Sequence, residues 1–477
     1  MHLRLGGFWL GFALVFGISP AAAQTTPQPV ADCESHDPAT AISGCTQIIN
    51  DPSNLGAYLF EAYDNRARAE LAKGDAADAL ADASRAVALN PENGKIYMVR
   101  ARAETVQKQY AAAQADYTKA IALMPTDPAP RRARADFELT RGQWNAASAD
   151  ASAALALNPQ DTDALVDRAL VEAVLNQSGP TIADASRAIT LGSTDPSAYF
   201  VRGISEGMQG QWAKDAADQT QALTLAPKYE EALIERCAAE VAQSQFAAAI
   251  ADANAELALN PREVRAYINR GLAYVSTKRA DAAMADANRA ITLAPGEARA
   301  YHLRGLAETQ LRQWEKAMTD ESKVIALDKA GDDMLYYDYL RRANAEAKLH
   351  RYADAIADET ALLRLKPKYE IAWNNRCWFR AVSGDAKGAL PDCRQALTLN
   401  PHDSAALDST GFVYLKLHDM KESIAYYSAA LKAAPQLASS YYGRALAEQA
   451  TGATAASRAD FAAAKKYDAT IAENFGT

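Results

Sequence analysis

The sequence repeats with a period of 34 residues, and this period constrains the fold more than any other feature. We call the residue that ends each repeat its closing residue. The closing residues are Pro91, Pro125, Pro159, Ser193, Pro227, Pro261, Pro295, Lys329, Pro367, Pro401, Pro435 and Ala469. Each interval is 34 residues except the one from 329 to 367, which is 38. Twelve repeats span residues 60–471, so we expect one solenoid and not several globular domains.

Each repeat has the pattern of two helices joined by a short turn. In the first, an alanine-rich segment at residues 57–72 precedes Lys73, Gly74 and Asp75, and residues 76–89 end at Asn90 and Pro91. The closing proline ends the second helix because it has no N–H to continue it. Aromatic residues recur at the turn, where we expect them to fill the space between neighbouring repeats: Tyr110, Trp144, Trp212, Phe246, Trp314 and Tyr352.

A small residue stands 24 places before each closing residue, where two helices must approach closely. The set is Ala67, Ala101, Ala135, Ala169, Gly203, Cys237, Gly271, Gly305, Ala343, Cys377, Gly411 and Ala445.

With this period, small residue, turn aromatic and closing proline, the chain resembles the tetratricopeptide repeat family. The segment YINRGLAYVSTKRADAAMADANRAITLAP carries the resemblance most clearly, and NNRCWFRA and GALPDCRQAL are similar to exported bacterial members. The resemblance implies an all-α, right-handed α-solenoid of about twelve helix-turn-helix repeats. It also implies a concave groove, lined by the first helices, that binds peptide segments of partner proteins, and it implies no reaction.

A set of charged residues recurs with the repeat. Arg stands 25 places and Asp 9 places before the closing residue in eleven repeats, and the remaining repeat has Thr410 and Tyr426 instead of both. Nine repeats add a Glu four residues after the Arg position. We expect each Arg to lie between two carboxylates and to fix the angle between the helices. A set that recurs in almost every repeat is structural, since an active site is normally one place.

The ends of the chain have a different character from the repeats. Residues 1–23 hold Arg4, an apolar run and Ala21–Ala23, which is the pattern of a secretory signal peptide cleaved after Ala23. An uncleaved anchor is the alternative. We therefore expect a periplasmic or secreted protein with a capping segment at residues 24–59, the solenoid at 60–471 and a tail at 472–477. A net charge of -9 argues against a nucleic-acid partner.

The five cysteines are expected to form two disulfides in an oxidising compartment. Cys377 and Cys393 have the same separation as the Arg and Asp partners, so they face each other across one hairpin. Cys33 and Cys45 would close the N-terminal segment. Cys237 faces Ala253 and is expected to be a buried thiol.

The sequence contains no recognisable catalytic, cofactor or metal motif, so we expect a protein that is not an enzyme. The histidines lie at no metal-ligand spacing, and no glycine-rich phosphate loop is present. An acidic cluster at Asp328, Asp332 and Asp333 is a weak metal candidate because it lacks the spacing of a calcium loop.

If the family geometry holds, the groove face lies on the first helices at steps of three and four residues. In the middle repeats it is apolar, and we predict partner contacts at Val166, Leu170, Phe200, Ile204, Met208, Ile234, Val241, Ile268, Leu272 and Val275. Packing against the rest of the solenoid is the equally weighted alternative. The late face is polar and aromatic, with candidates at Asn344, Asn374 and Trp378. The early face is charged and consists of Glu61, Asp64, Arg68, Lys95, Arg102, Arg132 and Asp136.

The function that fits these observations is a periplasmic scaffold or adaptor that binds an apolar peptide or helical segment of a partner. An accessory subunit of a cell-envelope enzyme is one alternative. A groove that binds glycan or a small ligand, with Trp378 stacking on sugars, is another.

Overall fold

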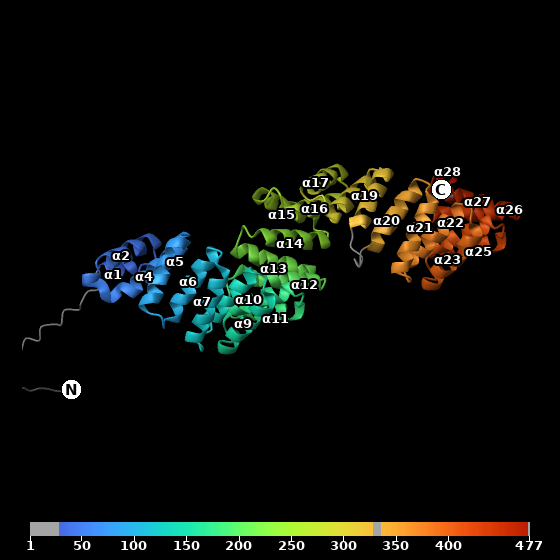
Figure 1. The fold of residues 1–477 in the computed structure, drawn as a ribbon. Helices are drawn as coiled ribbons and strands as arrows, with labels where there is room; N and C mark the ends of the chain where they lie inside the picture. Colours follow the sequence, from blue (N-terminus) through green and yellow to red (C-terminus); the bar gives the residue numbers. More distant parts are fainter. Residues whose placement is uncertain (1–27, 328–334, 476–477) are drawn as a thin grey trace, which may run out of the picture. The chain divides into compact units, whose positions relative to one another are not determined.

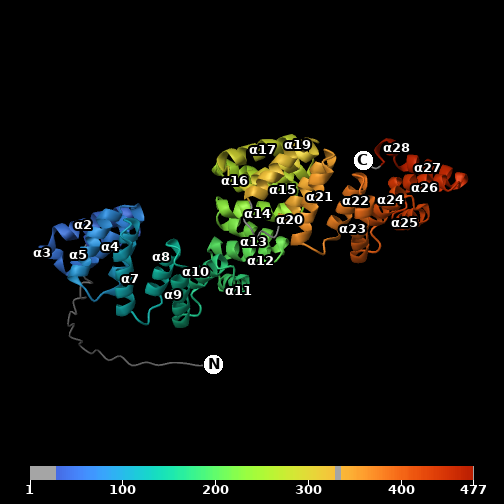
Figure 2. The same ribbon diagram turned by 45° about the vertical axis from the view of Figure 1, so that its right-hand side comes forward.

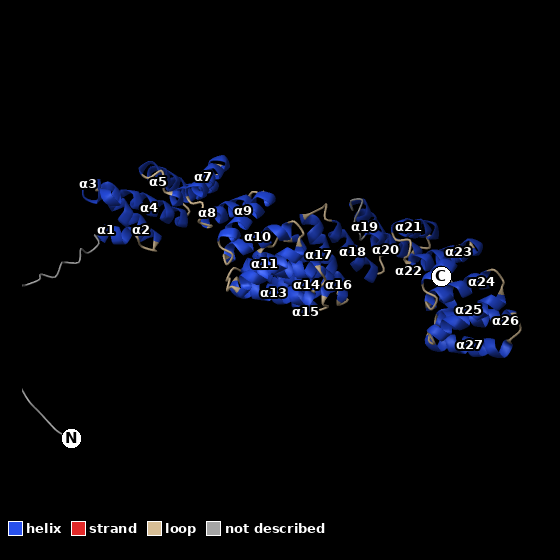
Figure 3. Cartoon of the chain, turned by 90° about the horizontal axis from the view of Figure 1, so that it is seen from below, coloured by secondary structure: helices blue, strands red, loops and turns tan. Residues whose placement is uncertain are grey.

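The computed structural model describes residues 28–327 and 335–475 and shows only helices there (Figure 3). The chain divides into two compact units between Val201 and Arg202, within one helix. In each unit successive helices pair as antiparallel hairpins and the hairpins stack on one another, which makes an all-α solenoid (Figure 1). The signal-peptide prediction for residues 1–23 and the acidic cluster at 328–333 lie outside the described residues.

The first unit starts with a short helical segment and continues into the repeats. Its helices are α1 (Gln28–Cys33), α2 (Pro38–Asn50), α3 (Pro52–Leu55), η1 (Gly56–Tyr58), α4 (Leu59–Lys73), α5 (Ala76–Leu89), α6 (Gly94–Val106), α7 (Tyr110–Leu123), α8 (Ala129–Thr140), α9 (Trp144–Leu157), α10 (Thr162–Val174), α11 (Ser178–Thr190) and the first part of α12 (Pro196–Met208). We number the hairpins by closing residue, so that hairpin 1 is α4–α5 and hairpin 4 is α10–α11.

The second unit takes in the rest of α12 and the later hairpins, up to hairpin 12 at α26–α27. Its further helices are α13 (Trp212–Leu225), α14 (Glu230–Ala242), α15 (Phe246–Leu259), α16 (Val264–Ser276), α17 (Ala280–Leu293), α18 (Ala298–Gln310), α19 (Trp314–Leu327), α20 (Leu335–Lys348), α21 (Tyr352–Leu365), α22 (Glu370–Val382), α23 (Ala386–Leu399), α24 (Ser404–Lys416), α25 (Met420–Ala433), α26 (Ala438–Ala450), α27 (Thr454–Tyr467) and α28 (Ile471–Asn474).

The turn within each hairpin contains one residue in the left-handed backbone region, 17 places before the closing residue. Half of these residues are glycine or asparagine, which adopt positive φ at low cost. The others include His350 and His418, with φ of 56° and 59°. These two histidines are therefore turn residues, as their place in the repeat indicates.

The core of each hairpin is made where the small residues allow the helices to meet. The small residue of every repeat is buried, and Ala67, Ala101, Ala135, Ala169, Ala343, Cys377 and Ala445 have 0% exposure. Larger apolar side chains, such as Leu303 and Leu362, fill the space between consecutive hairpins. Contact between neighbouring hairpins therefore adds to the burial that the two helices of each hairpin provide.

The eleven predicted Arg–Asp pairs are all present, and each is bidentate. Arg Nε donates to one Asp oxygen at 2.5–2.8 Å and Nη2 donates to the other at 2.6–3.0 Å. The Asp side chains are 3–12% exposed and the Arg side chains 11–26%, so the pairs are shielded from water. Two parallel charge-assisted hydrogen bonds fix the geometry of the two helices.

The third nitrogen of the same guanidinium, Nη1, reaches the preceding hairpin. In nine hairpins it donates at 2.6–3.3 Å to a Ser, Thr or Asn oxygen on the second helix of the hairpin before. These acceptors are Thr46, Thr118, Ser152, Thr220, Asn254, Asn288, Ser322, Thr360 and Ser428. One arginine therefore ties its own two helices together and also ties its hairpin to the previous one.

In five hairpins the repeated glutamate lies near the arginine, as predicted, but at ion-pair distance only. The closest contact between Arg Nε and Glu Oε1 is 3.7–3.9 Å in five hairpins, beyond hydrogen-bond distance. The Asp accepts from both Nε and Nη2, so in these five hairpins the Glu forms a longer ion pair with the same Arg and no hydrogen bond to it.

Hairpin 11 lacks the Arg and the Asp and replaces them with aromatic packing. Tyr414 stands at the Glu position and Tyr426 at the Asp position, and their rings stack with centroids 5.4 Å apart and an interplanar angle of 9°. The preceding hairpin carries Arg394 where the other acceptors are Ser, Thr or Asn. The acceptor is thus missing where no arginine follows to use it.

Both predicted disulfides are present, Cys33–Cys45 and Cys377–Cys393, with Cα atoms 4.6 Å and 5.3 Å apart. The first joins α1 to α2 in a short hairpin that precedes hairpin 1 and supplies Thr46 to Arg66. Cys237 is buried and unpaired, and its thiol donates to the carbonyl of Ala249 at 3.2 Å. Burial raises the pKa of this thiol to about 12.

Arg270 and Asp286 should be energetically coupled. A double-mutant cycle with Arg270→Gln and Asp286→Asn is expected to give a coupling of about 0.5–3 kcal/mol in urea unfolding, because both residues belong to one hydrogen-bonded network. Asp281→Asn, at an exposed position of the same helix, is the control and should be additive with Arg270→Gln. Additivity of the Arg270 and Asp286 changes would contradict the pairing.

Peptide mapping of the non-reduced protein should recover the two linkages Cys33–Cys45 and Cys377–Cys393. Cys237 should react with an alkylating reagent only after denaturation, because its sulfur is buried and its thiol pKa is raised. A linkage between Cys237 and any other cysteine would show that the register of the repeats is wrong.

Candidate partner-binding grooves

The first helices of hairpins 1–4 line one groove, as the repeat pattern predicts. This N-terminal groove has a volume of about 890 Å³, and its walls include Arg68 of α4, Met98 and Arg102 of α6, Arg132 and Asp136 of α8, and Asp163 and Asp167 of α10. Arg68, Arg102, Arg132 and Asp136 are all on the predicted charged face. These four residues, predicted from steps of three and four along the first helices, thus line one common cavity.

Charge is unevenly distributed along the N-terminal groove. Arg102 is exposed on the side of hairpin 2, whereas Asp136, Asp163, Asp167 and Asp195 gather on the side of hairpins 3 and 4, where Arg132 pairs with Asp163. Burial, and then the neighbouring Asp136, raises the pKa of Asp167 to about 7. A segment with separated charges fits this groove better than an apolar one.

The apolar stripe of the middle repeats is largely part of the packing. Val166, Ile234 and Ile268 are 1–4% exposed. Val166 and Ile268 also belong to clusters between neighbouring hairpins. A partner cannot reach these three side chains. Leu170, Phe200, Val241, Leu272 and Val275 are half-buried against the same kind of cluster, and Ile204 is half-buried too. Met208, 56% exposed, and Asn344, also exposed, remain accessible candidates.

A second cavity lies on the first helices of hairpins 10–12, and we call it the C-terminal groove. It has a volume of about 360 Å³ and is lined by Asn374 and Trp378 of α22, Asp408 of α24 and Ser439 of α26, with Ile471 and Phe475 opposite. The helix α28 lies beside α26 and α27 (Figures 1 and 2). The segment that follows hairpin 12 thus turns back onto the groove.

Phe475 packs against the aromatic residues of the C-terminal groove. Its ring centroid is 5.5 Å from that of Phe412, in an edge contact, and 4.9 Å from that of Tyr442. Trp378 lies on the other side of Phe412, with centroids 4.8 Å apart. The repeat pattern did not predict this contact, although an isolated aromatic residue after the last repeat is a possible signal.

Two polar groups line the same cavity. Asn374 Oδ1 is buried and has no hydrogen-bond partner among the described residues. Asp408 accepts a hydrogen bond from Ser440, and burial raises the pKa of Asp408 to about 6. The C-terminal groove therefore combines an aromatic wall with acceptors that can take donors from a ligand.

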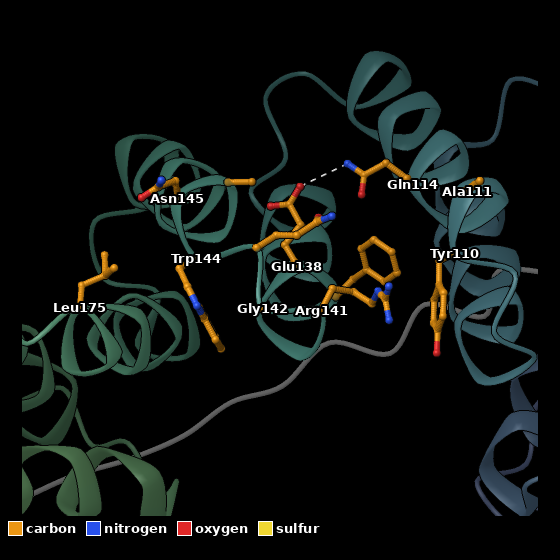
Figure 4. A pocket seen from close by; sticks show the side chains of 12 residues that line it. Tyr110, Ala111, Gln114, Glu138, Arg141, Gly142, Trp144, Asn145 and Leu175 are labelled. Carbon is orange, nitrogen blue, oxygen red and sulfur yellow. Dashed lines mark hydrogen bonds between the residues drawn. The ribbon is translucent and has the colours of Figure 1, made fainter. Parts of the chain in front are cut away.

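A third cavity, of about 730 Å³, opens at the turn edge of hairpins 2–4 (Figure 4). Arg141 lies over the ring of Tyr110 at 3.7 Å, and Gln114 donates to Glu138 at 3.2 Å across the cavity. Hairpin 3 has Pro130 and Arg131 where most repeats have a small residue and an aromatic or leucine. The cavity itself lies at the other end of α8, between Phe137 and the start of α7, and the turn aromatics Tyr110 and Trp144 line it.

The buried glutamates do not form an active site, since the same arrangement recurs in most hairpins. In eight of them Oε2 is buried and has no hydrogen-bond partner among the described residues: Glu70, Glu104, Glu138, Glu172, Glu240, Glu308, Glu346 and Glu448. Burial, and then the nearby Asp in most hairpins, raises the pKa of these carboxyls, to about 7 for Glu70, Glu104, Glu172, Glu240, Glu308 and Glu346.

No helix in the described part of the chain is both long enough and apolar enough to cross a membrane. The stacked two-helix repeats and their first-helix grooves define the class of α-solenoid repeat proteins.

Models of the tetratricopeptide repeat match residues 65–128, 239–298, 340–404 and 410–437. The chain belongs to the tetratricopeptide repeat family, whose members generally act as non-enzymatic scaffolds for protein interaction. Comparison with curated proteins gave no match.

Solved structures with the same kind of fold resemble the chain at low identity. The Cut9–Hcn1 hetero-tetramer of APC/C has 12% identity and a TM-score of 0.47, covering 90% of this chain and 98% of that one. A tetratricopeptide repeat protein from Parabacteroides merdae has 15% identity and a TM-score of 0.39, covering 54% and 99%. YrrB, described as having an unusual peptide-binding site, has 19% identity and a TM-score of 0.35, covering 39% and 96%.

The buried glutamates should make the protein less stable as the pH rises. Their folded pKa of about 7 lies above the ordinary value of 4.5, so the folded state binds more protons between these values. Their contribution is complete below pH 4.5 and is lost as the pH passes about 7. The melting temperature at constant ionic strength should therefore fall between pH 5.5 and 8. Glu104→Gln should reduce the fall and exposed Glu92→Gln should not; equal slopes in both variants would contradict this origin.

Proposed function

We propose that the protein is a non-catalytic scaffold. It binds a short helical segment of a partner protein, and an aromatic side chain of that segment anchors it in the groove. The observation that carries this proposal is the seat of Phe475 in the C-terminal groove, against Phe412 and Tyr442. The chain's own segment, residues 471–475, occupies the surface on which the family binds peptides, and it is helical up to Asn474. It therefore serves as an internal example of the ligand.

The remaining cavity is lined by hydrogen-bond acceptors, so the partner should also supply a hydrogen-bond donor. Beside Phe475, about 360 Å³ is left between the tail and the groove, with Asn374 Oδ1 and the Asp408 carboxyl at its wall. Burying an acceptor without a donor costs free energy, so a ligand that donates there gains affinity. A partner with an aromatic anchor and a neighbouring amide, hydroxyl or ammonium donor fits both features.

We further propose that the scaffold acts in the periplasm. The signal-peptide pattern of residues 1–23 supports export, and so do two disulfides, since such bonds are rare in reducing compartments. For the alternative of sugar stacking, Phe412 already covers part of the Trp378 ring at a centroid distance of 4.8 Å. No observation favours the accessory-subunit alternative.

Phe475→Ala should open the groove to a synthetic peptide of residues 468–477 labelled with a fluorophore. Fluorescence anisotropy should show saturable binding to the variant and at least about tenfold weaker binding to the wild-type chain, because a tethered segment competes at a high effective concentration.

A further substitution, Trp378→Leu, should weaken the binding seen in the Phe475→Ala chain. Trp373→Leu is the matched control, because Trp373 lies on the same helix but donates to Pro367 O and is not among the residues that line the groove. Equal affinities of wild type and Phe475→Ala, or equal losses in the two tryptophan variants, would contradict the proposal.

A further inference from the structure

Three side chains with metal-ligand chemistry converge in the second unit, away from the C-terminal groove. They are His302 of α18, Glu321 of α19 and Asp338 of α20, and one ligand atom from each lies within 4.8 Å of the other two. His302 Nδ1 is 3.6 Å from Glu321 Oε1 and 3.9 Å from Asp338 Oδ1. Their sequence spacing matches no metal motif because each comes from a different helix.

Glu321 is the unusual member of this cluster. It is 2% exposed, and its Oε2 is buried without a hydrogen-bond partner in the part of the chain that the structure describes. It stands 8 places before its closing residue, where five of the twelve hairpins have alanine. Gly305 faces it and makes room, since a Cβ there would lie 3.0 Å from Glu321 Oε1. The repeat thus places a carboxylate at a core position and points it at a histidine.

The two buried carboxylates of the cluster favour the binding of a cation. Glu321 and Asp338 are 2% and 5% exposed. Arg341 is a nearby cation, and its Nη1 lies 3.5 Å from Asp338 Oδ1 and 3.4 Å from His302 Nδ1. The Arg341 side chain is 33% exposed, so it can turn toward solvent when another cation enters. Two buried carboxylates would then balance a divalent ion.

The spacing of the ligand atoms suits zinc with small adjustment. Zinc binds His nitrogen and carboxylate oxygen at about 2.0–2.2 Å, so neighbouring ligands in a tetrahedral site lie about 3.3–3.6 Å apart. The two distances from His302, 3.6 Å and 3.9 Å, are at or just above that range, and the third, between the Glu321 and Asp338 oxygens, is at most 4.8 Å. Three protein ligands would leave the fourth position for water.

We propose that His302, Glu321 and Asp338 bind one zinc ion and thereby clamp hairpin 8 to hairpin 9. The next hairpin provides a natural contrast. Glu359 stands at the position of Glu321 and is also fully buried, but Leu340 replaces the histidine and Asn375 donates to Glu359 Oε1 at 2.8 Å. Glu359 Oε2 lacks a hydrogen-bond partner among the described residues, as Glu321 Oε2 does, but Glu359 Oε1 is held by Asn375 and no histidine stands at the position of His302. Glu359 is therefore a matched buried glutamate without the other two ligands.

The test is zinc titration of the full chain, without a polyhistidine tag and after removal of metal by chelator, in competition with a chromophoric zinc indicator. The wild-type chain should bind one zinc ion per chain and melt at a higher temperature with zinc than without. Glu321→Gln keeps the shape of the side chain and should weaken binding at least about tenfold, since even loss of an outer-shell partner of a metal ligand commonly costs that much.

Two further variants make the test decisive. Glu359→Gln should keep wild-type zinc affinity, and His302→Leu, which copies the residue of the next hairpin, should lose it as Glu321→Gln does. If Glu321→Gln does not give a native circular dichroism spectrum, His302→Leu alone decides. Wild-type binding no tighter than that of His302→Leu, or an equal loss in Glu359→Gln, would overturn the proposal.

Discussion

The repeated arginine fork is the interaction on which the rest of the structure depends. Two of its donors hold the aspartate of the same hairpin and a third reaches the preceding hairpin, as in Arg270 with Asp286 and Asn254. An exposed ion pair contributes little to stability, but a bidentate pair shielded between helices fixes orientation. The fork therefore sets both the angle within a hairpin and the step to the previous one, and both determine where the first helices present a groove.

Apolar packing fills the space that this frame leaves, and the volumes are matched in pairs. Glycine stands 24 places before the closing residue where a large side chain faces it, as with Gly305 and Glu321, or Gly411 and Tyr427. The cysteine pair Cys377 and Cys393 occupies the same two positions in hairpin 10. One geometric site thus holds a disulfide, a buried acid or an aromatic ring, so a repeat can vary its chemistry without changing its fold.

Features that recur within one hairpin were predictable from the sequence. The helix pairs, the arginine–aspartate pairs and both disulfides follow from period and spacing, because residues equally far from a turn face each other. Contacts between hairpins were harder to predict. The Ser, Thr or Asn acceptor was overlooked, although it tracks the presence of an arginine in the next repeat. Val166, Ile234 and Ile268 have the spacing of a groove face yet are buried, because spacing gives a direction and not the distance to the next helix.

The remaining surprises involve residues that appear only once. Phe475 lies beyond the last repeat, and the cluster of His302, Glu321 and Asp338 draws on three helices, so no periodic pattern could reveal either. In the same way the glutamates look like ion-pair partners by their spacing of four residues. They do lie within ion-pair distance of the arginine in five hairpins, but the aspartate accepts both hydrogen bonds from Nε and Nη2, so the glutamates stay outside hydrogen-bond distance.

The hydrogen bond that Arg Nη1 makes between hairpins runs from the arginine to an acceptor in the preceding hairpin, and the preceding hairpin is synthesised first. In nine hairpins the arginine reaches back to an acceptor that comes earlier in the chain, beginning with Arg66 and Thr46 of the disulfide-closed hairpin. After Arg444, the last arginine that pairs with an aspartate across its hairpin, the corresponding acceptor position holds Ala462, which offers no side-chain oxygen. A chain that emerges with its N-terminus first thus always has the acceptor in place before the arginine that needs it. Hairpins can then be added one at a time onto a finished template, and the exposed hydrophobic surface at any moment is limited to the most recent one.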